Sequence, residues 1–259
     1  MRGCDTVTAL PTEALAWAAL ALGALLVGFA KAGIAGTSSV AIVLFAAVMP
    51  AKESTGAMLL ALIVGDLIAI RYYSRHVEWR ILARLAPWAV LGVLAGAVVL
   101  DYADDAAVRP LIGAILLALV VLQLVLKYVR RDRDEPPDLP PLLRHGAAAA
   151  TGTSAGAATM LANAAGPIMV LYLFLSGFSK LRFLGTMAWF FLAINLFKVP
   201  FSVGLGLIDR STLLLTACLV PAVALGAVAG KAVVKRVEQR QFEIATLAMT
   251  AVGAALLMV

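Results

Sequence analysis

Long apolar blocks recur along the whole chain, and this pattern limits the fold more than any other feature of the sequence. Ten can be marked, near 12–30, 34–49, 55–73, 81–100, 108–128, 145–162, 166–177, 183–205, 211–230 and 241–258. Most are long enough to cross, as a helix, a hydrocarbon core about 30 Å thick. Only 14% of the residues are charged, against about 25% in a soluble domain. The sequence therefore predicts an all-α, polytopic helical membrane protein.

Lys and Arg residues gather in alternate connections between these blocks. If the N-terminus is outside, sixteen of the 21 lie on the cytoplasmic side and Lys198 lies within a block, while the other side holds Arg2, Lys52, Arg109 and Arg210. Basic loops stay in the cytoplasm, so we expect a multi-pass protein of the inner (cytoplasmic) membrane with both termini outside. This placement explains the net charge of +6 without a nucleic-acid partner. The lipid bilayer is the expected surrounding, and the oligomeric state, a homo-oligomer included, stays open.

The two halves of the chain resemble each other across a polar stretch, DRDEPPDLPP (132–141). PWAVLGVLAG (87–96) and PAVALGAVAG (221–230) share Pro-x4-Gly-x3-Gly at an offset of 134 residues. Matches at offsets of 129 and 130 align Asp66 with Asn195 and Gly36 with Gly166. We expect a first transmembrane repeat at 1–128, a cytoplasmic linker at 129–144 and a second repeat at 145–259.

Each half holds five segments, so the second would enter the membrane upside down. Two inverted five-segment repeats with short segments at matching positions are typical of secondary transporters, with a binding site near the midplane. The short segments here are 34–49 and 166–177, which are expected to be short or re-entrant helices.

The approaches to these short segments, GIAGTSS (33–39) and ANAAGP (162–167), are candidate anion sites. A half-helix that starts there would direct free N–H groups and a positive dipole end at an anion. The residues expected to contact the anion at the two starts are Gly33, Gly36, Thr37, Ser38, Ser39, Asn163 and Gly166. The alternative is that small residues only allow close helix packing, which is favoured for Gly92, Gly96, Gly226 and Gly230.

Lys198, in INLFKVPF (194–201), is the main substrate-binding candidate. A charge at bilayer depth needs a partner, a watery cavity or a function. Asn195 lies one helical turn before it, Thr186 is a further candidate in the same block, and Pro200 is expected to interrupt the helix. The alternative is that Lys198 extends its ammonium group to the membrane surface.

Asp66 is the candidate for proton coupling, because an isolated buried carboxylate favours its neutral form and can carry a proton. The alternative is a structural ion pair with Lys198 or Lys31. Lys31 itself is either an anion contact or a marker of the cytoplasmic side.

Other classes of function fit the sequence less well. A membrane-embedded enzyme would need clustered catalytic or metal-binding side chains, but the two histidines lie near block ends and Asp66 is alone. Cys4 and Cys218 are far apart, which indicates neither a disulfide framework nor a Cys-based metal site. We expect no metal, no cofactor and no enzymatic activity. An anion channel built on an inverted repeat remains the alternative to a transporter.

Four stretches resemble the sulfite exporter TauE/SafE family, also called toluene sulfonate uptake permeases. They are GFAKAGIAG (28–36), PAKESTGAMLLALIVGDLIAIRYYSRHVEWR (50–80), AAGPIMVLYLFLSGFSKLRFLGTM (164–187) and INLFKVP (194–200). The resemblance implies export or uptake of a small anion such as sulfite, a sulfonate or sulfoacetate, without a prosthetic group. Together with the inverted repeat it predicts a secondary transporter that works by alternating access and is coupled to protons.

Overall fold

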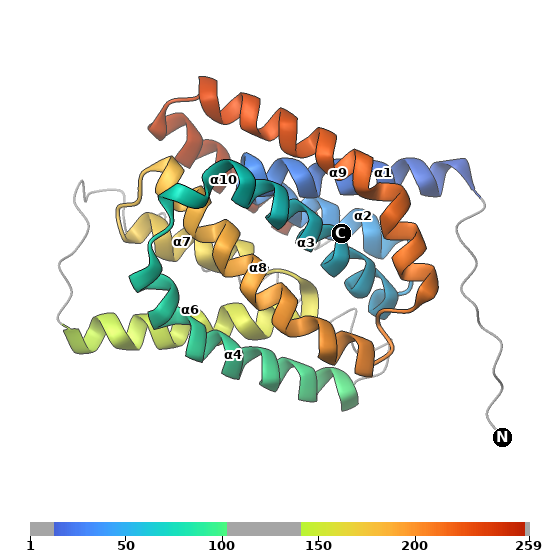
Figure 1. Ribbon diagram of the computed structural model, residues 1–259, viewed down its shortest axis with the longest axis horizontal. Coiled ribbons are helices and arrows are strands. Elements are labelled where there is room, and N and C mark those ends of the chain that lie inside the picture. Colours follow the sequence, from blue (N-terminus) through green and yellow to red (C-terminus); the bar gives the residue numbers. More distant parts are fainter. Residues whose placement is uncertain (1–12, 103–140, 257–259) are drawn as a thin grey trace.

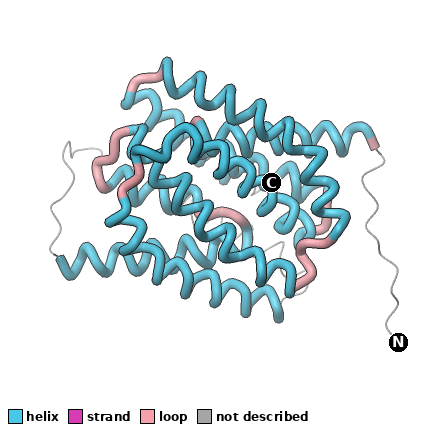
Figure 2. Tube along the Cα trace, in the orientation of Figure 1, coloured by secondary structure: helices cyan, strands magenta, loops and turns pink. Residues whose placement is uncertain are grey.

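The computed structural model describes residues 13–102 and 141–256, and all regular secondary structure in these ranges is helical (Figure 2). The elements are α1 (Ala14–Ala32), the 3-10 turn η1 (Ala35–Thr37), α2 (Ser38–Val48), α3 (Ala51–Tyr73), the 3-10 turn η2 (Ser74–His76), α4 (Trp79–Tyr102), α6 (Pro141–Ala162), α7 (Gly166–Leu175), α8 (Lys180–Gly204), α9 (Arg210–Arg236) and α10 (Gln239–Leu256). The all-α prediction is confirmed. The block expected at 108–128 lies outside the described residues, as does most of the expected linker, whose last residues, 141–144, belong to α6.

The described helices fall into long and short ones. Five stretches are long and apolar enough to cross a membrane, namely Ala14–Ala32, Lys52–His76, Trp79–Tyr102, Lys180–Gly204 and Arg210–Arg236. In contrast, α2 has 11 residues and α7 has 10, too few to span a bilayer core of about 30 Å. The prediction of a polytopic helical membrane protein is confirmed at this level, and the two short segments do form short helices.

Two close helix pairs, α1 with α9 and α4 with α6, lie on opposite sides of the bundle, and α3 and α8 run between them (Figure 1). Glycine allows the backbones of α1 and α9 to touch. A Cβ atom on Gly28 would lie 1.9 Å from the Val223 carbonyl oxygen, and one on Gly226 would lie 1.9 Å from that of Leu25. No side chain fits in such a space, so only glycine is compatible with this contact.

The pair α4 and α6 is built in the same way. A Cβ atom on Gly156 would lie 2.1 Å from the Ala89 carbonyl oxygen, and one on Gly92 would lie 2.1 Å from that of Thr153. Gly96 and Gly230 also lie at these two contacts. The glycines of the repeated motif therefore have the packing role that the sequence favoured.

The two ends of the bundle differ in charge. At one end, Arg182 at the start of α8 pairs with Glu78, and the Lys180 ammonium donates to carbonyl oxygens of Val234 and Val237 at the end of α9. At the other end, the start of α3 packs against the turn before α9, where a Cβ atom on Gly56 would lie 1.8 Å from the Leu207 carbonyl oxygen. The basic connections after α3, α7 and α9 thus share one end of the bundle.

Asp209 caps the N-terminus of α9, and its removal tests the local stability of this end. Its carboxylate accepts hydrogen bonds from the Thr212 amide at 2.7 Å and hydroxyl at 2.6 Å, and from the Ser211 hydroxyl. Asp209→Ala is expected to cost about 1 kcal/mol of stability, measured by thermal unfolding in detergent. A loss no larger than that of Asp101→Asn, at the exposed end of α4, would contradict this.

The same cap predicts a pH dependence. The hydrogen bonds from Thr212 and Ser211 hold the pKa of Asp209 below its ordinary value of 3.8. A lowered pKa contributes stability that is complete above the ordinary value and is lost as pH falls through the lowered one. The difference between wild type and Asp209→Ala should therefore shrink only in strongly acidic solution.

Candidate functional site

The site forms where two helices break. α1 ends at Ala32, before η1 and α2, and α6 ends at Ala162, before α7. Asn163 has a φ of 53°, and the Ala164 amide donates to the Ala158 carbonyl oxygen, which is a common way for a helix to end. The breaks bring the two short helices together, since a Cβ atom on Gly166 would lie 3.6 Å from the Ser38 hydroxyl oxygen.

A narrow cavity of about 30 Å³ lies between these breaks and α8. It has room for about two water molecules. Its polar lining comes from Lys31, Ser38, Thr159 and Asn163, and its remaining lining residues are Ala30, Ala35, Leu62, Gly166, Phe183, Leu184, Met187, Ala188 and Phe191. Lys31 is the charged residue of this lining, so the cavity has a cationic wall and an otherwise mainly apolar surface.

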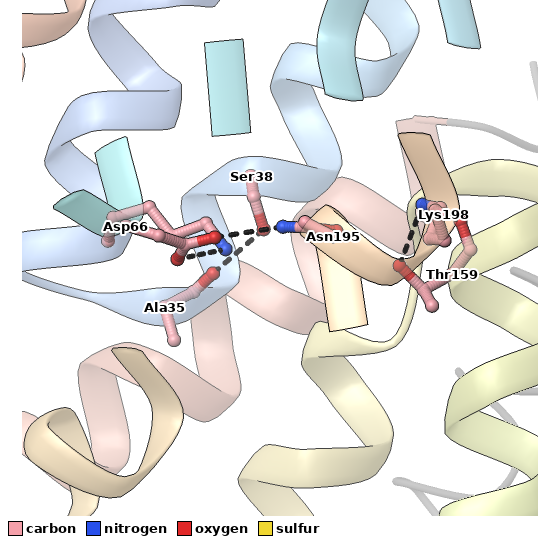
Figure 3. A network of polar contacts seen from close by, with 7 residues as sticks. Ala35, Ser38, Asp66, Thr159, Asn195 and Lys198 are labelled. Atoms are coloured by element: carbon pink, nitrogen blue, oxygen red, sulfur yellow. Dashed lines mark hydrogen bonds and ion pairs between the residues drawn. The ribbon is translucent and has the colours of Figure 1, made fainter. Parts of the chain in front are cut away.

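Lys31 pairs with Asp66, and Figure 3 shows Asp66 together with Asn195, which also contacts it. The Lys31 ammonium lies 2.8 Å from Asp66 Oδ1 and 4.1 Å from the centre of the Phe191 ring. Gly65 makes room for this side chain, because a Cβ atom there would lie 2.9 Å from Lys31 Cγ. The Asn195 amide donates to Asp66 Oδ2 at 2.8 Å. Asp66 and Asn195 are both fully buried, so the carboxylate is held between α1 and α8.

Lys198 forms a second network, at the end of α6 (Figure 3). Its ammonium donates to the Thr159 carbonyl oxygen at 2.5 Å, the Thr159 hydroxyl at 3.2 Å and Asn163 Oδ1 at 2.7 Å. The Asn163 amide then donates to the Thr55 carbonyl oxygen on α3. A cation is favourable at a helix C-terminus, where the last carbonyl groups lack partners. These hydrogen bonds of Lys198 therefore connect the break between α6 and α7 to α8.

The burial of Lys198 excludes the idea that its ammonium extends to the membrane surface, because the residue is 1% exposed. Pro200 also differs from expectation. It does not end α8, which continues to Gly204. Neighbouring helices can satisfy the backbone around a proline within a membrane helix.

The two networks hold two basic side chains and one acidic one. Lys31 and Lys198 are the basic groups, and Asp66 is the carboxyl group that contacts Lys31. Lys198 contacts neutral acceptors in the described residues. The starts of α2 and α7 add the positive ends of two helix dipoles. An anion bound here would favour the charged forms of both lysines and would lie near two helix N-termini.

The structure brings some of the predicted residues together and separates others. Lys31, Ser38, Asn163 and Gly166 line the cavity, while Lys198, Asn195 and Asp66 lie behind its wall. Gly33 packs against Gly230, Thr37 donates to the Ile34 carbonyl oxygen, and Gly36 and Ser39 are buried near the start of α2. Thr186 lies outside the cavity and accepts a hydrogen bond from the Glu78 amide at 3.1 Å.

Sequence reasoning missed Thr159 and Phe191. Each lies four residues before a residue that was singled out, Asn163 and Asn195 respectively, and so on the same helix face. That spacing is a weak signal in an apolar helix, and nothing else in the sequence distinguishes these two side chains.

A comparison with known families identifies the family of the chain. A family model described as sulfite exporter TauE/SafE matches residues 20–257. The chain belongs to the TauE/SafE family. It is therefore a membrane transporter of the sulfite-exporter type, and the resemblance carried by its four sequence stretches is confirmed. No curated protein and no solved structure matches the chain.

In this TauE/SafE protein, most of the cavity comes from the stretches that resemble the family. Ala30, Lys31 and Ala35 belong to GFAKAGIAG, and Leu62 to the stretch that contains α3. Gly166, Phe183, Leu184 and Met187 belong to AAGPIMVLYLFLSGFSKLRFLGTM. The family pattern therefore coincides with the walls of the candidate site.

Proposed function

We propose that the protein is a proton-coupled secondary transporter that moves a small anion, such as sulfite, a sulfonate or sulfoacetate, across the cytoplasmic membrane. The observation that carries this proposal is the presence of two lysines, Lys31 and Lys198, against one carboxyl group, Asp66, inside the bundle near the starts of α2 and α7. Lys31 contacts the anion at the cavity wall, with Ser38, Thr159 and Asn163 as hydrogen-bonding groups. Lys198 adds its charge from behind Asn163, and Asp66 carries the proton.

Two inverted repeats support alternating access. Gly28 of α1 contacts Val223 of α9, and Gly156 of α6 contacts Ala89 of α4 in the same way. Gly28 and Gly156 are 128 residues apart, and Ala89 and Val223 are 134 residues apart. The contacts of Gly226 with Leu25 and of Gly92 with Thr153 repeat the same offsets. Equivalent contacts between equivalent residues are what an internal two-fold relation would produce.

The small size of the cavity favours a transporter over a channel. Its volume of about 30 Å³ leaves no room for an oxyanion with its hydration shell, so the site must widen to bind one. At the end away from the basic connections, Gly56 touches Leu207 and Asn163 is bonded to Thr55. With both termini outside, the basic end is cytoplasmic, so the end where Gly56 contacts Leu207 faces the outside.

The test is flux of radiolabelled sulfite and sulfoacetate into proteoliposomes. Wild type should show saturable uptake, and Lys31→Met should lose at least nine-tenths of it, because removing a charged contact to an anion costs about 1.5–3 kcal/mol. Lys235→Met, which removes an exposed cation at the end of α9, is the matched control and should transport like wild type.

Accumulation of the anion against its electrochemical gradient, measured with the membrane potential held at zero, separates the two mechanisms, since a channel cannot produce it. Absence of saturable flux in wild type with both anions would contradict the proposed function. Full flux in a folded Lys31→Met protein would contradict the assignment of Lys31.

A further inference from the structure

Lys31 contacts Asp66 on one side and faces the cavity on the other. Its ammonium contacts Asp66 at 2.8 Å, and the same side chain lines the cavity. The side chain is 10% exposed and that of Asp66 is 0% exposed. The cavity is therefore the direction from which a second anion can reach this ammonium. An anion bound there and an ionised Asp66 would share one cation.

Asn195 is suited to both protonation states of Asp66. At present its amide nitrogen donates to the carboxylate, while its Oδ1 is buried and accepts no hydrogen bond from the described residues. A carboxylate only accepts hydrogen bonds, whereas a protonated carboxyl group also donates one. Rotation of the Asn195 amide by a half-turn would present Oδ1 to that donor. A carboxylate in place of the Asn195 amide could accept a hydrogen bond from protonated Asp66 but could not donate one to ionised Asp66.

Few other charges face Asp66. Lys31 faces it from α1, and Lys198 on α8 is the next cation. From α9, Val223 reaches this level, while Lys231 lies over the Tyr72 ring, 3.6 Å from its centre. The sequence of α2 holds no titratable side chain. Protonation of Asp66 would therefore change the charge beside Lys31 without compensation from another acid.

We propose that the anion and a proton bind together, because a proton on Asp66 releases Lys31 to the anion. This inference rests on the proposed function and specifies its coupling. The proton comes from solution and adds to one Asp66 oxygen, the Lys31–Asp66 ion pair ends, and the anion takes its place on the ammonium. Because such coupling is reciprocal, anion binding also favours protonation. Proton and anion then travel in the same direction, as a symport, whereas an exchanger needs the two to compete.

The first test follows the proton without an anion. Infrared difference spectra of the purified full-length protein are recorded between mildly alkaline and mildly acidic pH. Acidification of wild type should produce a protonated-carboxyl band that Asp66→Asn lacks and that the control Asp101→Asn keeps. If no band depends on Asp66, the inference is overturned whatever the protein transports.

The second test gives the direction of coupling. Proteoliposomes take up radiolabelled sulfoacetate, whose charge is the same in mildly acidic and mildly alkaline solution, under pH gradients of both signs. An acidic outside should drive accumulation in wild type and in Asp101→Asn, and Asp66→Asn should lose this response. Accumulation driven by an acidic inside would overturn the inference and leave the proposed anion transport intact. The wild-type measurement alone tests the direction of coupling, even if a variant does not fold.

Discussion

Asp66→Ala is expected to destabilise the folded protein by about 3–5 kcal/mol, because it leaves the Lys31 ammonium buried without its carboxylate. The Asn195 amide would lose its acceptor as well. The measurement is denaturant or thermal unfolding of the purified protein in detergent. Asp101→Ala is the matched control, since Asp101 is exposed at the end of α4 and its loss should change stability by less than about 0.5 kcal/mol.

The double variant Lys31→Met with Asp66→Leu separates folding from transport. Replacing both members of a buried ion pair by apolar residues of similar size is often neutral, so most of the lost stability should return. Transport should not return, because the cation at the cavity wall is gone. A double variant as unstable as Asp66→Ala would show that the pair itself contributes the stability, and a transporting double variant would remove Lys31 from the site.

Gly28→Leu and Gly156→Leu should each prevent the assembly of a folded, monodisperse protein. The first added carbon already lies 1.9 or 2.1 Å from a carbonyl oxygen of the facing helix, so the backbones must separate. Overpacking of ordinary cores costs about 1–3 kcal/mol, and a displaced helix should cost more. Size-exclusion chromatography in detergent and circular dichroism would report the loss.

The chain offers matched controls for these substitutions. A Cβ atom on Gly146, in α6, or on Gly204, at the end of α8, would meet no atom within 4 Å. Gly146→Leu and Gly204→Leu should therefore fold. If they fail as Gly28→Leu does, the defect comes from the leucine side chain in general and not from the helix contact.

The sequence predicted the helices well because the thickness of a bilayer sets the length of the apolar blocks that cross it. It also identified the charged residues, since Lys31, Asp66 and Lys198 are conspicuous in an apolar background. It could not choose between Lys198 and Lys31 as the partner of Asp66, because only the packing of α1 against α3 decides.

The acceptors around Lys198 were also beyond prediction. Thr159 and Asn163 are 39 and 35 residues away in the chain, and one acceptor is a backbone carbonyl group, which has no residue-specific signal. Thr186 shows the opposite error. It was a candidate because it lies in the same apolar block as Lys198, but its hydroxyl accepts a hydrogen bond from the Glu78 amide near the start of α4.

The glycine contacts between α1 and α9 and between α4 and α6 have a mechanical consequence. Each contact joins a helix from one half of the chain to a helix from the other, with backbone against backbone. Packed interfaces of this kind change between discrete arrangements and do not slide freely. We therefore expect each cross-half helix pair to move as one rigid unit. On this view the hinges of an opening motion lie in the broken helices and in α3 and α8 between the pairs.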